Sequence, residues 1–225
     1  MLSPMFRRIR LPSFVAVTLL VLVGLAGCQE PVRPAGVPPV APQAGQTAPS
    51  HNPQPYVVLE PGWAYRFTMP GGLASRLEIH EPADLEDPVS GRQVRGYQMV
   101  WDDETIVVTT DQDWLLELGD IGEGGTLLYK TPKRHFPLYP KEGQTWTESF
   151  EEEFPGSGSF TYKVSGFETV ETPAGRFDNT ARVEVELDAP SGRDHWTEWY
   201  APGVGLIKKS SGLELVKLEK PVSNH

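Results

Sequence analysis

Residues 182–188 read Arg-Val-Glu-Val-Glu-Leu-Asp, and this strict alternation is the clearest structural signal in the chain. In an extended strand successive side chains point to opposite faces, so Val183, Val185 and Leu187 share one face and the charged residues share the other. One face of the strand is therefore apolar and the other faces water. Parallel strands are covered on both faces and read as continuous apolar runs, so this pattern predicts an antiparallel sheet.

Similar segments recur along the chain. Alternating or β-branched runs occupy residues 63–67, 76–79, 97–101, 105–109, 114–118, 126–129, 144–150, 160–164, 182–187, 195–200, 204–209 and 213–218. Turn-forming Gly, Pro, Ser and Asp residues separate these runs closely enough to leave no room for a long helix. The stretch 81–86 tolerates a helix best, and one turn is the most that we expect there. The sequence predicts an all-β domain, with an antiparallel sheet forming a sandwich or a (half-)barrel and little or no helix outside the N-terminal signal.

The composition excludes several classes of protein. The chain has 225 residues, with 20 Lys and Arg, 30 Asp and Glu, and one Cys. A single Cys excludes an intrachain disulfide framework and the cysteine clusters of structural zinc sites. The net charge of −10 argues against nucleic acid as a partner, because phosphate recognition needs a basic face. We expect no cofactor and no metal site.

The N-terminus is organised as an export signal. Arg7, Arg8 and Arg10 precede an uncharged, mostly apolar run at residues 14–27. This run is shorter than the about 20 residues that a bilayer-spanning helix needs. A basic segment followed by a short apolar run is typical of a secretory signal peptide, here residues 1–27.

Leu25, Ala26, Gly27 and Cys28 end this run. They resemble the lipobox of bacterial lipoproteins, in which Leu and two small residues precede the Cys. The resemblance covers only the signal, and it implies cleavage before Cys28, attachment of acyl chains such as palmitate to Cys28, and a membrane anchor. Gln29 follows where inner-membrane retention signals usually carry Asp, so the resemblance points to the outer membrane, facing the periplasm. The outer face of the cell membrane is the alternative in a host with one membrane, and an uncleaved anchor with a free cysteine is a second alternative.

Removal of residues 1–27 leaves 17 basic and 30 acidic residues, a net charge of −13. Such a body is repelled by anionic headgroups, so attachment would depend on the acyl chains. Residues 29–55 contain eight prolines and no aromatic residue. This composition cannot form a core and predicts a flexible tether over residues 28–55, with a ligand for a proline-recognition domain as the alternative. The β domain then covers residues 56–220, followed by a tail at 221–225.

The second half of the chain carries another resemblance. Residues 136–146 contain Phe-Pro-Leu-Tyr-Pro and Gly-x-x-Trp, 172–178 read Thr-Pro-Ala-Gly-Arg-Phe-Asp, and 199–208 read Trp-Tyr-Ala-Pro-Gly-Val-Gly-Leu-Ile-Lys. The same motifs in the same order are similar to those of a group of β-rich bacterial envelope proteins without an assigned activity. The resemblance begins at residue 136 and implies an antiparallel β domain and no known activity.

Sequence motifs of common enzymes are missing from the chain. Residues 155–159 lack the Gly-x-Ser-x-Gly spacing of serine hydrolases, and 122–125 lack the Gly-Lys-Ser/Thr of a phosphate loop. Acidic clusters at residues 81–87, 102–104, 111–113 and 151–153 offer the oxygen ligands that calcium prefers, but none has EF-hand spacing. We interpret these clusters as solvated faces and turns, and we expect no catalytic residue.

The aromatic residues give the most specific binding hypothesis. Trp196 and Trp199 lie three positions apart on one predicted strand, so they should point to opposite faces. One of them then lies away from the core or lines a second cavity. Together with Trp146 they are the candidate ligand-binding residues. Ordinary packing in a sheet with both faces partly covered is the alternative.

Three functions are compatible with the sequence. The first, which we favour, is a membrane-anchored envelope lipoprotein whose non-enzymatic β domain binds or scaffolds an envelope protein. The second is a carrier or sensor of a hydrophobic small molecule, which requires an apolar cavity lined by Trp and Leu. The third is an enzyme acting on envelope polysaccharide, which requires two acids converging in a groove, at least one with a shifted pKa.

Overall fold

The computed structural model describes residues 54–151 and 157–220. The predicted signal peptide, the lipobox residues Leu25, Ala26 and Gly27, the lipidation site Cys28, the tether up to residue 53 and the tail at 221–225 lie outside the described residues. The described residues belong to one compact unit, Pro53–His225.

Antiparallel strands account for nearly all of the regular structure. In chain order the elements are β1 (Ala64–Thr68), the short 3-10 helix η1 (Pro70–Gly72), β2 (Ala74–Ile79), β3 (Ala83–Glu86), β4 (Gln93–Trp101), β5 (Glu104–Thr110), β6 (Trp114–Gly122), β7 (Gly125–Pro137), β8 (Thr145–Glu151), β9 (Ser157–Thr172), β10 (Gly175–Ala189), β11 (Gly192–Ala201), β12 (Gly205–Lys209) and β13 (Glu214–Glu219). Within residues 54–151 and 157–220, no helix is long and apolar enough to cross a membrane.

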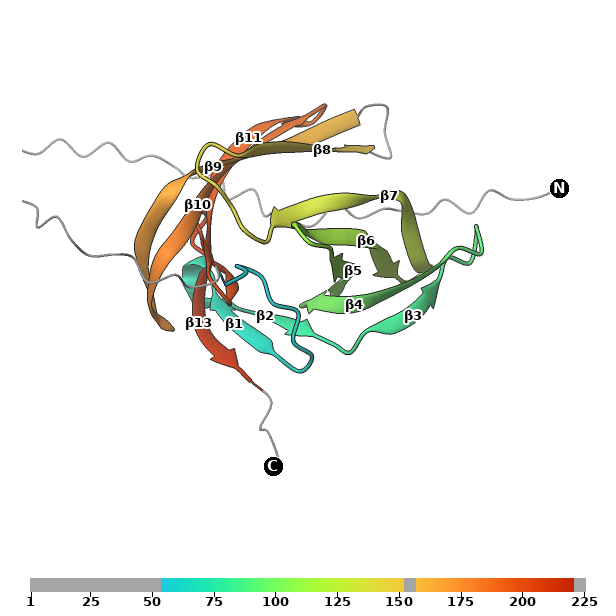
Figure 1. The fold of residues 1–225 in the computed structure, drawn as a ribbon, viewed down its shortest axis with the longest axis horizontal. Coiled ribbons are helices and arrows are strands. Elements are labelled where there is room, and N and C mark those ends of the chain that lie inside the picture. Colours follow the sequence, from blue (N-terminus) through green and yellow to red (C-terminus); the bar gives the residue numbers. More distant parts are fainter. Residues whose placement is uncertain (1–53, 152–156, 221–225) are drawn as a thin grey trace, which may run out of the picture. The chain divides into compact units, whose positions relative to one another are not determined.

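The strands form one curled sheet. Its order is β7-β6-β5-β4-β2-β1-β13-β12-β11-β10-β9-β8, and β3 pairs with β4 beside this path. Two meanders, β1 to β7 and β8 to β13, are joined where the first strand pairs with the last. Because the two end strands, β7 and β8, come together again, the sheet is nearly closed into a barrel (Figure 1). The predicted all-β antiparallel fold is confirmed, and of the two predicted architectures the barrel is the one formed.

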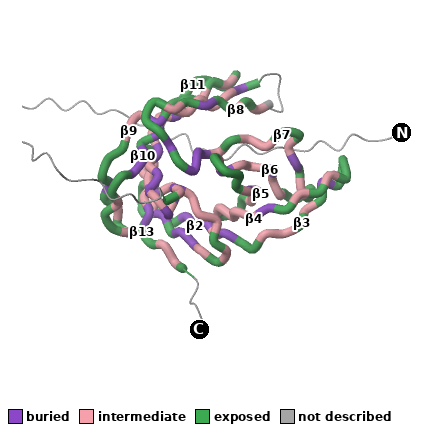
Figure 2. Tube along the Cα trace, in the orientation of Figure 1, coloured by how far each residue is buried: buried purple, intermediate pink, exposed green. Residues whose placement is uncertain are grey.

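The alternating segment 182–188 lies in the middle of this sheet. It belongs to β10, which pairs with β9 on one side and β11 on the other. Val183 and Val185 are completely buried on the inner face, as their alternation predicts, and Glu186 is exposed on the outer face. Figure 2 shows buried and exposed residues alternating along the strands.

The stretch 81–86, where we expected one helical turn at most, contains no helix, and its residues 83–86 form strand β3. Within β3, Leu85 is half-buried between the exposed Asp84 and Glu86, the alternation of a strand. Backbone pairing with β4 over Glu86↔Gln93 to Ala83↔Gly96 then fixes it. Four residues are too few for the alternation to stand out against a charged sequence, which is why sequence analysis missed this strand.

The seam between β7 and β8 is closed by side chains. In the described part of the chain no backbone ladder joins these two strands. Arg134 Nε of β7 lies 3.0 Å from Glu148 Oε1 of β8, and the rings of Phe136 and Trp146 lie 6.2 Å apart. Proline at position 132 fits this arrangement, since proline is tolerated on a strand at the edge of a sheet.

Two apolar clusters pack against the sheet. The first gathers around Phe136, Trp146 and Tyr200, and the second around Phe67, Ile207 and Leu215. Residues 54–59, the lead-in segment, pack onto the first cluster before β1 begins, and Tyr56 is 5% exposed there. Its backbone N–H donates to Leu138 O at 2.9 Å, and its hydroxyl donates to Asn179 O at 2.6 Å.

Candidate functional site

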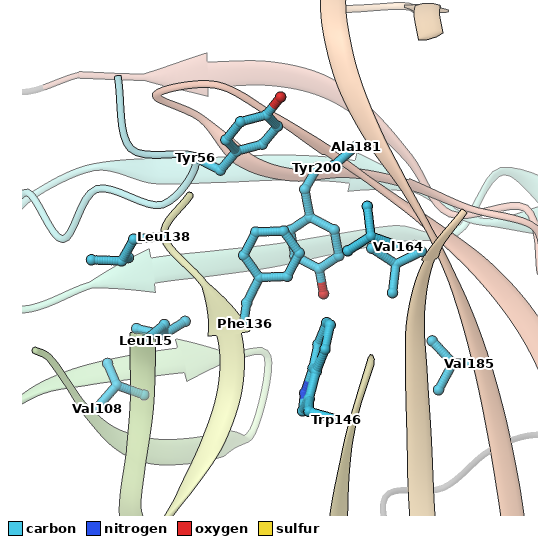
Figure 3. Close-up of a cluster of buried hydrophobic side chains, with 11 residues drawn as sticks. Tyr56, Val108, Leu115, Phe136, Leu138, Trp146, Val164, Ala181, Val185 and Tyr200 are labelled. Atoms are coloured by element: carbon cyan, nitrogen blue, oxygen red, sulfur yellow. The ribbon is translucent and has the colours of Figure 1, made fainter. Parts of the chain in front are cut away.

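A column of aromatic side chains runs through the interior. Phe136 stacks on Tyr200 with ring centroids 3.9 Å apart (Figure 3). Trp146 stacks on Tyr162 with ring centroids 4.8 Å apart. Figure 3 shows Phe136 and Tyr200 face to face in the middle of the first cluster, with Tyr56 on one side and Trp146 on the other. These rings come from β7, β8, β9, β11 and the lead-in segment. At this place the protein's own side chains pack against one another.

A buried ion pair lies beside this column. Glu198 of β11 is 5% exposed, and its carboxylate faces inward because Glu198 is registered with the buried Val183. Lys209 Nζ of β12 lies 2.8 Å from Glu198 Oε1. Tyr200 donates its hydroxyl hydrogen to Glu198 Oε2 at 2.6 Å, and Trp196 Nε1 donates to Oε1 at 2.8 Å. The carboxylate is thus fully bonded in a low-dielectric setting.

The environment of Glu198 decides its charge state. Burial by itself would raise the pKa of this carboxyl, but Lys209 and the hydrogen bonds from Tyr200 and Trp196 lower it to about 2. Burial and the Glu198 charge raise the pKa of Tyr200 well above its usual range. Glu198 is therefore ionised and Tyr200 protonated at neutral pH, which is the arrangement that the observed hydrogen bonds require.

A second polar cluster lies on β6 and β7. The Tyr129 hydroxyl lies 2.9 Å from Glu117 Oε1 and 2.6 Å from Asp120 Oδ2. Lys133 Nζ sits 3.7 Å above the Tyr129 ring, and His135 Nδ1 lies 3.5 Å from Glu117 Oε2. Glu117 is registered with Val108 of the first apolar cluster, so this group also faces inward.

Besides burial, carboxylates of both polar clusters raise the pKa of the same residue, Tyr162. Burial raises the pKa of Tyr162, and the charges of Glu198, Glu117 and Glu148 raise it further. Three carboxylates therefore surround this ring within electrostatic range. Each carboxylate forms an ion pair: Glu198 with Lys209, Glu117 with Lys133, and Glu148 with Arg134. This inner-face set of paired charges is the candidate functional site.

The structure divides the three predicted tryptophans between the two faces. Trp146 and Trp196 lie on the inner face and are connected through Phe160 and Tyr162. Trp199 points to the opposite face, registered with the exposed Arg182, and packs against the second apolar cluster. Its Nε1 donates to Glu168 Oε1 at 2.6 Å. The opposite orientation of Trp196 and Trp199 follows the prediction, and the three residues do not form one site.

Trp146 has an unusual indole nitrogen. The side chain is 4% exposed, and among the described residues none accepts a hydrogen bond from its Nε1. A buried donor without a partner costs about 1–3 kcal/mol. The packing that holds Trp146 against Tyr162, Trp114 and Phe136 must offset this cost.

Sequence analysis did not select the charged residues of the inner face. A signal was present for Glu198, because residues 196, 198 and 200 share one face of a strand and two of them are aromatic. No such signal existed for Lys209 or for the Glu117–Tyr129–Asp120 group. These contacts depend on strand register, which shifts in both regions. The pairing of β11 with β12 skips Ile207, and the pairing of β6 with β7 passes from Glu117↔Lys133 to Gly119↔Leu128.

Two of the acidic clusters considered as calcium ligands have structural partners, and the side chains of the cluster at 151–153 lie outside the described residues. Asp87 Oδ1 accepts from Val89 N and Ser90 N within its turn, and its Oδ2 accepts from Leu128 N of β7 at 3.3 Å. Asp111 Oδ1 accepts from the backbone N–H groups of Asp113 and Trp114. No group of three or more His, Cys, Asp or Glu side chains is placed to hold a metal ion in the part of the chain that the structure describes.

Two hollows lie away from the aromatic column. One, of about 440 Å³, lies near the tips of β8 and β10 and is lined by Ser149, Ser159 and Asp188 among others. The other, of about 220 Å³, is lined by Arg66, Ala74, Ser75, Arg76 and Asp102. Neither is lined by the Trp and Leu side chains that a carrier of a hydrophobic ligand requires.

Comparison with known proteins identifies one segment. A family model described as DUF3108-like matches residues 158–211, which run from β9 to the turn after β12. No curated protein matches the chain. Among solved structures, a candidate exported protein of Bacteroides fragilis with a YmcC-like fold aligns with 74% of this chain and 100% of its own length. The identity is 14% and the TM-score is 0.36. The chain is thus similar to a DUF3108-like domain over residues 158–211.

Proposed function

We propose that this protein is a lipid-anchored bacterial envelope protein whose β domain binds a protein partner on the outside of the barrel and has no enzymatic activity. The observation that carries this proposal is the filled interior. The Phe136–Tyr200 stack, with Tyr56 and Trp146 on either side, occupies the middle of the first apolar cluster. A pocket for a small molecule would need about 300–1,000 Å³ at this place.

The outer face of β11 offers the best partner surface. Trp199 is half-buried there between Glu168 and Lys208, whose Nζ lies 6.0 Å from the ring centroid. Many interface hot spots contain a Trp side chain bordered by charged residues of both signs. Lipidation of Cys28 would hold this surface at the membrane.

A crosslinking experiment in intact cells tests both parts of the proposal. A photoreactive amino acid at position 199 should give a discrete protein adduct, and the same residue at the exposed Arg193 at the strand tip should not. The wild-type chain should have the intact mass of residues 28–225 plus acyl chains. Cys28→Ser should lack the acyl mass and give less adduct. A wild-type chain without acyl mass would refute the anchor, and equal crosslinking from both positions would refute the surface.

A carrier of a hydrophobic ligand is the second candidate. It is favoured by the unpartnered Trp146 Nε1, which an oxygen atom of a bound molecule would satisfy. It would require the aromatic column to open, since Trp146 is held by ring contacts on several sides. Polysaccharide cleavage is less well supported, although Glu117 and Asp120 do converge, because both carboxylates are bonded to Tyr129.

A further inference from the structure

The Tyr129 hydroxyl lies close to two carboxyl oxygens but has only one hydrogen to donate. Its hydroxyl oxygen is within hydrogen-bond distance of one oxygen of Glu117, at 2.9 Å, and one of Asp120, at 2.6 Å. A phenol has one hydrogen to donate, and an ionised carboxylate has none. Both contacts can be full two-centre hydrogen bonds only if one of the two carboxyl groups is protonated, since a hydrogen shared between two acceptors bonds each of them more weakly. With both carboxylates ionised, one of the two short oxygen–oxygen contacts is repulsive.

The surroundings identify Asp120 as the group that takes the extra proton. Burial raises the pKa of Asp120, and the charge of Glu117 raises it further, against the opposing effects of Tyr129 and Lys133. Burial would also raise the pKa of Glu117, but His135, Lys133 and Tyr129 together lower it. Glu117 therefore remains an acceptor while Asp120 becomes a donor. Two neighbouring carboxyl groups with opposite shifts share their protons in this way.

We propose that Asp120, Tyr129 and Glu117 form a proton-binding site that links the acidity of the surroundings to the stability of the β6–β7 region. In the loaded state a solvent proton resides on Asp120, which donates it to Tyr129 Oη, and Tyr129 donates its own hydrogen to Glu117. Release of the Asp120 proton to solvent leaves two carboxylates facing one phenol, and the Asp120–Tyr129 contact weakens. No other bond is made or broken.

The site lies where the β3–β4 hairpin closes onto β7. A guanidinium nitrogen of Arg92 donates to Tyr129 O, and Leu128 N donates to Asp87 Oδ2. Tyr129 thus contacts the proton-binding group with its side chain and the hairpin with its backbone. Loading the site is expected to hold Tyr129 in place and so to stabilise this junction.

The charged groups nearest the site among the described residues come from three strands. Glu117 is on the same strand as Asp120, and Lys133 and His135 are on β7. Glu104 is on β5, where burial and the charges of Asp103 and Asp120 raise its pKa. Since the folded-state pKa of Asp120 is raised, the folded protein binds a proton more tightly than the unfolded chain does. The contribution of this group to stability is therefore present in acid and falls as pH rises through the folded pKa.

The first test is the carboxyl carbon resonance of Asp120 followed by NMR in the full mature chain carrying Cys28→Ser. Its titration midpoint should lie above that of an aspartate in the unfolded chain. In a Glu117→Gln chain, the midpoint should move down, because the neighbouring charge is gone. A wild-type midpoint at or below the unfolded value would overturn the proposal, and this result does not depend on any variant at the site folding.

The second test compares urea unfolding of the same chain with and without Asp120→Asn, from below the ordinary aspartate pKa of 3.8 up to neutral pH. The Asn amide donates to Tyr129 at every pH, as the protonated acid does in the loaded state. The wild-type midpoint should fall relative to that of the variant as pH rises. Asp84→Asn, on the exposed face of β3, should show no such divergence. Parallel curves for wild type and Asp120→Asn would contradict proton binding at this site.

Discussion

The Lys209→Met variant is expected to lose about 3–5 kcal/mol of unfolding free energy, because it leaves Glu198 buried without its cation. Lys209 Nζ lies 2.8 Å from Glu198 Oε1, and the Glu198 side chain is 7% exposed. Tyr200 and Trp196 would still donate hydrogen bonds, but neither carries a compensating charge. Urea denaturation monitored by tryptophan fluorescence measures the change.

The adjacent residue provides a matched control. Lys208 Nζ lies 2.6 Å from Glu214 Oε1, but both side chains are about one-third exposed and the pair is on the outer face. Lys208→Met should cost no more than about 1 kcal/mol, as is usual for a surface ion pair. A double variant, Glu198→Gln with Lys209→Met, should recover much of the loss, since no uncompensated charge remains. Equal costs for Lys208→Met and Lys209→Met would show that the interior pair is solvated.

The same ion pair gives the wild-type protein an acid-sensitive component of stability. The pKa of Glu198 is about 2 in the folded chain against an ordinary value of 4.5. A depressed folded-state pKa contributes stability above 4.5, and this contribution is lost as pH falls toward 2. Its full size is on the order of 3 kcal/mol by linkage. The sign is opposite to that of Asp120, so the two groups act in different directions in acid.

Phe136→Ala is expected to destabilise the fold by about 3–5 kcal/mol, the usual cost of deleting a fully buried ring. Phe136 is 1% exposed and contacts Tyr200, Tyr56 and Trp146. It also lies on β7 at the seam, where no backbone ladder replaces the lost contact.

Phe167→Ala is the control for this variant. Phe167 contacts the other side of Tyr56, with ring centroids 6.3 Å apart, but is 37% exposed. Its removal should cost well under half as much, because less apolar area returns to water. Chemical denaturation of both variants gives the comparison. A loss for Phe136→Ala no larger than that for Phe167→Ala would mean that the interior is loosely packed.

The fold class could be predicted because its signals are local. The alternation at 182–188 and the closely spaced turns depend only on neighbouring residues, and they led to an antiparallel all-β domain. The choice between a sandwich and a barrel could not be made from local sequence patterns. It depends on β7 and β8 meeting through Arg134, Glu148, Phe136 and Trp146, which no periodicity reports.

The candidate site could be predicted only in part. Aromatic content pointed to Trp146 and Trp196, which do line the inner face. The charged residues could not be predicted, because Glu198 lies opposite Lys209 only where Ile207 has no partner in the pairing of β11 with β12. Tyr129 likewise reaches Glu117 and Asp120 across a bulged pair of strands. Bulges change which residues face each other, and single-sequence patterns assume that strands lack them.

Native mass spectrometry of the mature chain tests the central claim, that the barrel is filled by its own side chains. The chain should carry Cys28→Ser and be purified from cells without detergent, so that no detergent displaces a ligand. We predict a single species with the mass of the polypeptide alone. A bound apolar molecule that is lost on denaturation, and absent from a Trp146→Phe chain, would contradict the claim and show that the interior carries a ligand.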